Sequence, residues 1–187
     1  MADEQGVRAD RRRNRVRIID AARSVILARG RAAGMDEIAA VAGLAVGTLY
    51  RHFPTKDELV DAILMELAEE TSALVGSFEE ALASKRESPI VLLEALLRTV
   101  VVELSTTRML RDALGGSEPQ LRGMQERANA LLAQLVQAAH QDETLRDEVL
   151  VEDIILLLRA APDERLSAQE RERWLQTVLH GVLATRP

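Results

Sequence analysis

The sequence contains no cysteine and very few aromatic residues. Of its 187 residues, only Tyr50, Phe53, Phe78 and Trp174 are aromatic. The absence of cysteine excludes disulfides, thiolate zinc sites and cysteine nucleophiles, and it is typical of proteins in a reducing cytosol. A core must therefore be built from aliphatic side chains and alanine, a composition that favours helices over strands.

The chain also lacks a long hydrophobic run. No stretch reaches the ~18 uninterrupted apolar residues that a membrane span requires. The polar amino-terminal segment does not have the apolar centre of a signal peptide. We therefore expect a cytoplasmic protein with no membrane partner. Because no strand pattern occurs, the fold class is predicted to be all-α.

Basic charge is concentrated at the amino-terminal end. Residues 1–56 hold 11 basic and 6 acidic side chains, a net charge of +5, whereas the remainder holds 13 and 24, a net charge of −11. This asymmetry indicates one end that meets a polyanion. The basic residues are 22 arginines and 2 lysines, a ratio that a GC-rich coding sequence also produces.

Three short helices are predicted within residues 11–53. Gly30 is expected to end the first helix, and Gly43 separates the second helix from the run VGTLYRHF. Ala39 and Ala42 are small enough for two helices to cross closely. A tight turn between two short helices is the layout of a helix-turn-helix, whose second helix enters the major groove of DNA.

A capping box marks the next boundary. Thr55 is followed three residues later by Glu58, which predicts the start of a long amphipathic helix. The side chains expected to turn inward from this helix are Leu59, Ile63, Leu67, Leu74 and Phe78. Further helices are predicted over residues 90–104, 120–140, 146–160 and 168–185.

These segments resemble a known family. The runs IIDAARSVILARG and MDEIAAVAGLAVGTLYRHFPTKDEL are similar to the DNA-binding domain of the tetracycline-repressor (TetR) family of bacterial regulators, over about residues 11–71. The resemblance implies a helix-turn-helix domain over residues 11–54 and a helical ligand-binding and dimerisation domain over residues 55–187. Residues 1–10 are predicted to form a disordered basic arm. The implied function is a homodimeric, ligand-responsive repressor that binds a pseudo-palindromic operator in double-stranded DNA.

The resemblance also implies roles for individual residues. Val46, Gly47 and Thr48 would face bases from the amino end of the recognition helix, and Tyr50, His52 and Lys56 would contact phosphates. The implied DNA-binding set is Ala45, Val46, Gly47, Thr48, Tyr50, Arg51, His52 and Lys56. For Tyr50, the alternative is a place in the core.

The sequence departs from the family pattern at two positions. Gly34 and Ala45 stand where threonine and serine are common, so two hydroxyls that could cap helices or bind phosphate are missing. Arginines ahead of the helix-turn-helix could compensate. Those considered are Arg8, Arg11, Arg12, Arg13, Arg15 and Arg17, of which Arg11, Arg12, Arg13 and Arg15 are the predicted DNA arm. Insertion into the minor groove and a solvated basic tail remain the two interpretations.

The last two predicted helices carry broad apolar faces. Their apolar residues are Ile154, Ile155, Leu157 and Leu158, followed by Leu175, Val178, Leu179 and Val182. By resemblance, these helices would pair with their copies across a two-fold axis, and burial within the monomer is the alternative. A small-molecule effector of unknown identity would bind within this domain.

No catalytic constellation is recognisable. The three histidines, at positions 52, 140 and 180, do not have metal-ligand spacing, and no glycine-rich phosphate loop occurs. We therefore predict neither an enzyme nor a cofactor or metal site. The alternative function is a helical interaction module whose helix-turn-helix no longer reads DNA.

Overall fold

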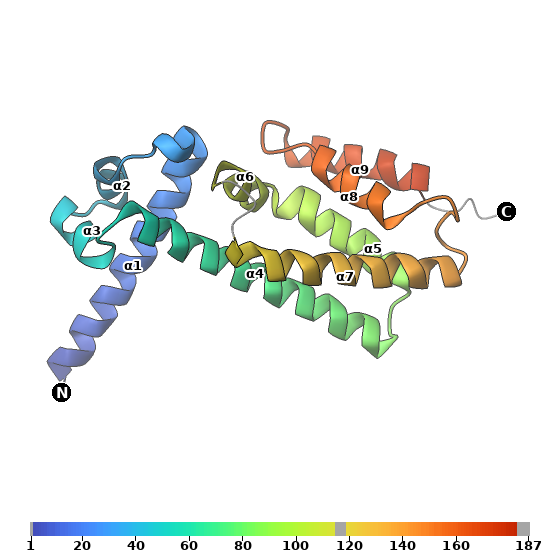
Figure 1. Ribbon diagram of the computed structural model, residues 1–187, viewed down its shortest axis with the longest axis horizontal. Helices are drawn as coiled ribbons and strands as arrows, with labels where there is room; N and C mark the ends of the chain where they lie inside the picture. The colour runs from blue at the N-terminus through green and yellow to red at the C-terminus, as the bar shows by residue number, and fades with distance from the viewer. Residues whose placement is uncertain (1, 115–118, 183–187) are drawn as a thin grey trace. The chain divides into compact units, whose positions relative to one another are not determined.

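The computed structural model describes residues 2–114 and 119–182, and the regular elements of this part of the chain are all helices (Figure 1). The predicted all-α fold class is confirmed. None of the described helices is both long and apolar enough to cross a membrane. In chain order the elements are α1 (Ala2–Arg29), η1 (Gly30–Ala32), α2 (Met35–Ala42), α3 (Val46–His52), α4 (Lys56–Ser84), α5 (Pro89–Arg98), η2 (Thr99–Glu103), α6 (Ser105–Leu114), α7 (Pro119–Gln141), α8 (Val151–Ala160) and α9 (Ala168–Val182).

The described chain divides into two compact units. Unit 1 contains residues 2–67 and 110–114, and unit 2 contains residues 68–109 and 119–182. The domain boundary predicted after residue 54 falls between α3 and α4, whereas the compact units divide α4 itself after Leu67. The first part of α4 therefore belongs to unit 1 and the rest to unit 2.

Unit 1 is built on the apolar face of α1. Spacings of three and four residues place Ile18, Ala22 and Ile26 on one side of the helix, and all three are buried. α2 packs against α1, and α3 follows α2 across a short turn. Gly30, with a φ of 59°, ends α1 where the sequence predicts its end.

The first helix begins earlier than the sequence predicts. A disordered arm is predicted over residues 1–10, whereas α1 begins at Ala2. Local composition explains the difference, because acidic residues stand near the start and alanine and arginine are good helix formers. Asp10 also forms an ion pair with Arg13, three residues along the helix. A helix gives the arginines fixed directions that a flexible arm does not have.

The core of unit 2 is aliphatic. α5 packs along α7, and α9 lies beside α5 (Figure 1). Leu93 of α5 and Leu135 of α7 are fully buried, whereas Phe78 packs at the margin of the core. On α4, Val75 is buried, while Leu74 and Phe78, which the sequence predicts to turn inward, are half-buried.

Two helices of unit 2 differ from their predicted extents. The run 90–104 is predicted as one helix, but α5 ends at Arg98 and passes into the π-helix η2 before α6 begins. The helix predicted over 146–160 begins only at Val151, where the N–H of Leu150 bonds Asp153 Oδ2 at 2.9 Å. The last helix starts at Ala168 and is described to Val182, and residues 183–185 of its predicted extent lie outside the described residues.

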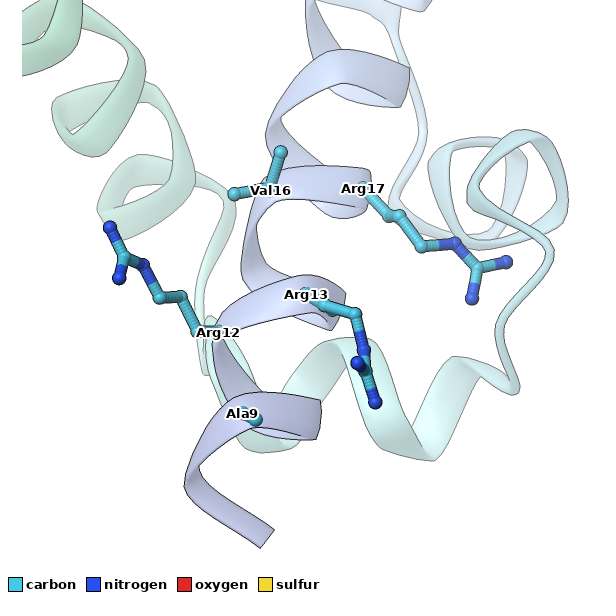
Figure 2. A pocket seen from close by; sticks show the side chains of 5 residues that line it. All are labelled: Ala9, Arg12, Arg13, Val16 and Arg17. Atoms are coloured by element: carbon cyan, nitrogen blue, oxygen red, sulfur yellow. The ribbon is translucent and has the colours of Figure 1, made fainter. Parts of the chain in front are cut away.

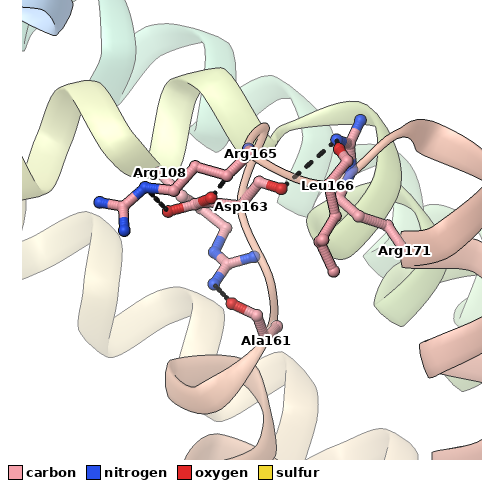
Figure 3. Close-up of polar contacts among 6 residues, drawn as sticks. All are labelled: Arg108, Ala161, Asp163, Arg165, Leu166 and Arg171. Carbon is pink, nitrogen blue, oxygen red and sulfur yellow. Dashed lines mark hydrogen bonds and ion pairs between the residues drawn. The ribbon is translucent and has the colours of Figure 1, made fainter.

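Two arginines hold the connection between α8 and α9 (Figure 3). Arg171, 8% exposed, donates to the carbonyl oxygen of Leu166 at 2.5 Å and to that of Val102 in η2 at 3.2 Å. Arg108 of α6 donates to the carbonyl oxygen of Ala161 at 3.1 Å. Carbonyls at helix ends and in loops lack helical donors, and these guanidinium groups supply them.

We predict that Arg171→Met destabilises unit 2. Methionine keeps an apolar side chain of similar length, but the carbonyl groups of Val102 and Leu166 lose their donor, which costs about 1–3 kcal/mol for interior groups. Urea unfolding followed by circular dichroism should show a lower midpoint. Arg173→Met, on the exposed side of the same helix, is the matched control and should change stability by less than about 0.5 kcal/mol. Equal midpoints for the two variants would contradict this role of Arg171.

Candidate nucleic-acid interface

The turn between α2 and α3 depends on one glycine. Gly43 follows α2 with a φ of 63° and a ψ of 38°, in the left-handed region. Its N–H bonds the carbonyl oxygen of Ala40 at 3.1 Å, and the N–H of Leu44 bonds that of Ala39 at 3.0 Å. Glycine adopts this conformation without steric cost, whereas other residues lose roughly 1–2 kcal/mol. The turn thereby fixes the direction in which α3 leaves α2.

α3 has a buried side and an exposed side. Leu49 is 0% exposed, whereas Tyr50 is 44% exposed, which excludes the alternative that Tyr50 is a core residue. Phe53, directly after the helix, is buried. Of the predicted DNA-binding set, the exposed residues are Ala45, Val46, Gly47, Tyr50 and Arg51, and the half-buried ones are Thr48, His52 and Lys56.

Lys56 lies on α4 and not on α3. The predicted capping pair starts this helix, because Thr55 Oγ1 accepts a hydrogen bond from the N–H of Glu58 at 3.2 Å. Lys56 occupies the first turn, where the helix dipole disfavours a cation and favours an anion. A phosphate at this helix end would be stabilised both by the dipole and by the lysine.

Neither α2 nor α3 has a side-chain cap at its start. Gly34 and Ala45 occupy the N-cap positions in extended conformations, and neither supplies a side-chain hydrogen bond to the first turn. The threonine and serine that are common in the family at these positions would place a hydroxyl at each N-cap. Their absence therefore leaves first-turn N–H groups of both helices without a side-chain acceptor.

Two arginines of the predicted arm have partners within unit 1. Arg13 forms its ion pair with Asp10 on α1 itself. The guanidinium carbon of Arg15 lies 4.9 Å from the ring centroid of Phe53, in a cation–π contact. The structure thus places Arg15, which is itself exposed, against the end of α3, and Arg11 and Arg12 are exposed as well.

Arg17 makes a structural contact with α2 that the sequence alone does not predict. Its Nη2 donates to the carbonyl oxygen of Ala42 at 2.6 Å and to that of Gly43 at 3.3 Å, so it caps the carboxyl end of α2. No local pattern signals a bond across 25 residues. Figure 2 shows Arg17 and Arg13 on one side of α1 and Arg12 on the other, around a hollow that Val16 also lines.

The imidazole of His52 lies among positive charges. Burial lowers the pKa of His52 below its ordinary value of 6.5, and the charges of Arg11, Arg15 and Arg51 lower it further. Arg51 is held along α3 by a bond from its Nε to the carbonyl oxygen of Gly47 at 3.2 Å. Burial and these charges both favour the neutral imidazole, whereas a phosphate placed beside it would favour its protonated form.

Known proteins share both this local geometry and the whole fold. The family model of bacterial regulatory proteins, tetR family, matches residues 18–63, which include α2 and α3. The crystal structure of the TetR transcription regulatory protein from Mycobacterium vanbaalenii covers 95% of this chain and 99% of its own, with 32% identity and a TM-score of 0.60. The ketosteroid transcriptional regulator KstR2 of Mycobacterium tuberculosis shares the fold, with a TM-score of 0.69 over 91% of this chain and 95% of its own at 19% identity.

A relative known as a repressor matches in part. The HTH-type transcriptional repressor KstR2 of Rhodococcus jostii (strain RHA1) is 37% identical over 86 residues, which are 46% of this chain and 40% of the relative. The full-length similarity to the Mycobacterium vanbaalenii protein decides the classification. The chain belongs to the TetR family of bacterial transcriptional regulators, and the residues that the family model matches include the helix-turn-helix of α2 and α3.

We predict that restoring the missing hydroxyls has unequal effects. Ala45→Ser should stabilise the protein by about 0.5–2 kcal/mol, because alanine is a poor N-cap, whereas Gly34→Ser should gain only a few tenths. Thermal unfolding of the two variants measures the difference. A larger gain for Gly34→Ser than for Ala45→Ser would be inconsistent with the cap assignment.

We predict that DNA binding is accompanied by proton uptake at His52. The free protein has a His52 pKa below 6.5, and a neighbouring phosphate raises that pKa in the complex, so affinity should rise as pH falls between the two values. The slope should be at most about one decade of affinity per pH unit and protomer. Fluorescence anisotropy with a labelled duplex from pH 8 to about 5.5 measures it. His52→Gln should flatten the profile, and His140→Gln, in unit 2, is the matched control.

Proposed function

We propose that this protein is a transcriptional repressor that binds a pseudo-palindromic operator as a homodimer and releases it when a small molecule binds. The single observation that supports the DNA-binding role is that α3 has one buried side and one exposed side. Leu49 is buried in the core, and the exposed residues are Val46, Gly47, Tyr50 and Arg51. A short helix with small and polar exposed residues fits a major groove. The repressor relative from Rhodococcus jostii supports the direction of regulation.

The proposed base contacts and phosphate contacts come from different parts of the interface. Val46, Gly47 and Thr48 form the first turn of α3, where small side chains let the backbone approach base edges. Tyr50 and Lys56 carry a hydroxyl and an ammonium group, which suit phosphate oxygens. We assign sequence reading to the first group and positioning on the backbone to the second.

The homodimer is proposed to form through α8 and α9. Ile154, Leu175 and Leu179 are buried within the chain itself, so they belong to the core of unit 2 and not to the contact between copies. Leu156 is 65% exposed, and Leu157 is half-buried. Covering these side chains with a second copy would bury apolar surface that the single chain leaves in water.

The proposed effector is a small molecule that binds in unit 2, as the family resemblance implies. Binding in this unit would shift the equilibrium between a form that fits the operator and one that does not. Because the family consists of transcriptional regulators, we assign this chain a binding role and not a catalytic one. Operator DNA as the partner places the proposed activity in the cytoplasm.

Selection of bound sequences from a random duplex library tests this function. A dimer should enrich two half-sites related by a dyad, with centres about 34–36 Å apart or a modest multiple of that distance. Footprinting of the enriched duplex should show the same symmetry. Failure to enrich any sequence, with a folded protein, would favour the helical interaction module instead.

We predict that Lys56→Gln weakens binding to all duplexes by a similar factor. A phosphate contact carries no sequence information, and its loss should lower the salt slope of log affinity by ~1. Tyr50→Phe should also weaken binding uniformly, without a change in the salt slope. Lys85→Gln is the control, because Lys85 is the other lysine of the chain and lies in unit 2. A changed base preference at one operator position would show that the residue reads sequence.

A further inference from the structure

The buried face of α1 continues toward the amino terminus as a row of arginines. At about 100° per residue, Arg8, Arg11, Arg12 and Arg15 fall within an arc of roughly 100° on the helix. Ile18, Ile19, Ala22 and Ile26, three or four residues apart further along, fall on the same side and are buried. The side of α1 that packs on the core of unit 1 therefore becomes basic where that core ends.

The arginine row meets α3 at its carboxyl end. Arg15 lies over the ring of Phe53, directly after α3. The charges of Arg11 and Arg15 both reach the imidazole of His52, the last residue of α3. Arg8, Arg11 and Arg12 are exposed, and none of the three forms an ion pair with a side chain that the structure describes.

Other arginines of the same segment are used differently. Arg13 diverges from Arg12 by about 100° around α1 (Figure 2) and is paired with Asp10. Arg17 caps α2. Arg13 and Arg17 thus lie outside the row, and Arg15 within it contacts Phe53. Arg8, Arg11 and Arg12 are the members of the row that make no ion pair with a described side chain.

We propose that Arg8, Arg11 and Arg12 form a rigid, helical phosphate-binding face that holds the DNA backbone outside the half-site read by α3. The occupant is the sugar–phosphate backbone of the same operator, because the face is continuous with His52 on α3 and its three side chains are all cationic. The face works as part of a helix and not as a flexible arm in the minor groove. This inference rests on the proposed function.

The helix itself is the property to test, because a flexible arm with the same charges would also bind DNA. Arg8→Ala/Arg11→Ala/Arg12→Ala removes the charges and keeps a good helix former at each position. Asn14→Pro keeps every charge, starts the helix at residue 14, and detaches the preceding residues from it. Asn14→Gly is a milder variant with the same purpose, and Asn14→Ala and Lys85→Gln, the latter in unit 2, are the matched controls.

Each full-length protein is titrated by fluorescence anisotropy against a labelled 30-base-pair duplex recovered by selection with the wild-type chain, at several salt concentrations. The triple variant should lose about tenfold or more in affinity at 0.1 M salt, and its salt slope should fall by about three per protomer. Asn14→Pro should lose affinity to a similar extent, Asn14→Gly less, and the two controls should bind as the wild type does. Equal thermal midpoints show that the variants are folded.

Two results would overturn the inference while leaving the proposed function intact. If Asn14→Pro and Asn14→Gly bind as tightly as wild type while the triple variant does not, the charges act from a flexible arm. If the triple variant binds as wild type does, the face does not contact DNA. Failure of the wild-type chain to select any duplex would overturn the proposed function itself.

Discussion

Burial of Leu49 is the interaction on which α3, the proposed reading helix, depends. α3 has 7 residues, far fewer than the roughly 12–15 that an isolated helix needs to be even marginally stable in water. Its N-cap, Ala45, adds no side-chain hydrogen bond. The helix is therefore held by its tertiary contacts: Leu49 within the core, Phe53 behind it, and the left-handed turn at Gly43 in front of it.

Arginine side chains bond backbone carbonyl groups in both units. The guanidinium groups of Arg17, Arg108 and Arg171 all donate to backbone carbonyls at helix ends or in a loop. A planar group with five donors can satisfy several carbonyls at once, which a lysine does less well. In a chain with 22 arginines and 2 lysines, the number of basic residues alone therefore does not measure affinity for DNA.

Local signals predicted much of the fold, and contacts between distant residues set the rest. Gly30, Gly43 and the pair of Thr55 and Glu58 each act within one turn, so the helix ends they predict are found. The break after Arg98 has no such signal, because residues 90–104 contain neither glycine nor proline. A carbonyl of that π-helix bonds Arg171, 69 residues away, and no sequence pattern indicates that partner.

In the candidate interface too, local patterns predict some features, whereas contacts between distant residues determine others. The exposed face of α3 follows from helical periodicity around Leu49, so the sequence could predict that face as a whole. The sequence does not distinguish one arginine of α1 from another, whereas the structure gives Arg13, Arg15 and Arg17 different partners. Phe53 lies 38 residues from Arg15 in the chain, and the contact between them shows where α1 meets α3.

Because electrostatic interactions are screened over short distances, a protein with a net negative charge can still bind DNA through a local basic surface. The chain as a whole carries a net charge of −6, yet residues 1–56 carry the basic excess. At physiological ionic strength, interactions between exposed charges are screened beyond about 8 Å. A phosphate beside α1 and α3 therefore interacts mainly with Arg11, Arg51 and their neighbours. The excess of acidic residues elsewhere would oppose non-specific contacts of DNA with other surfaces, which favours encounters through the proposed interface.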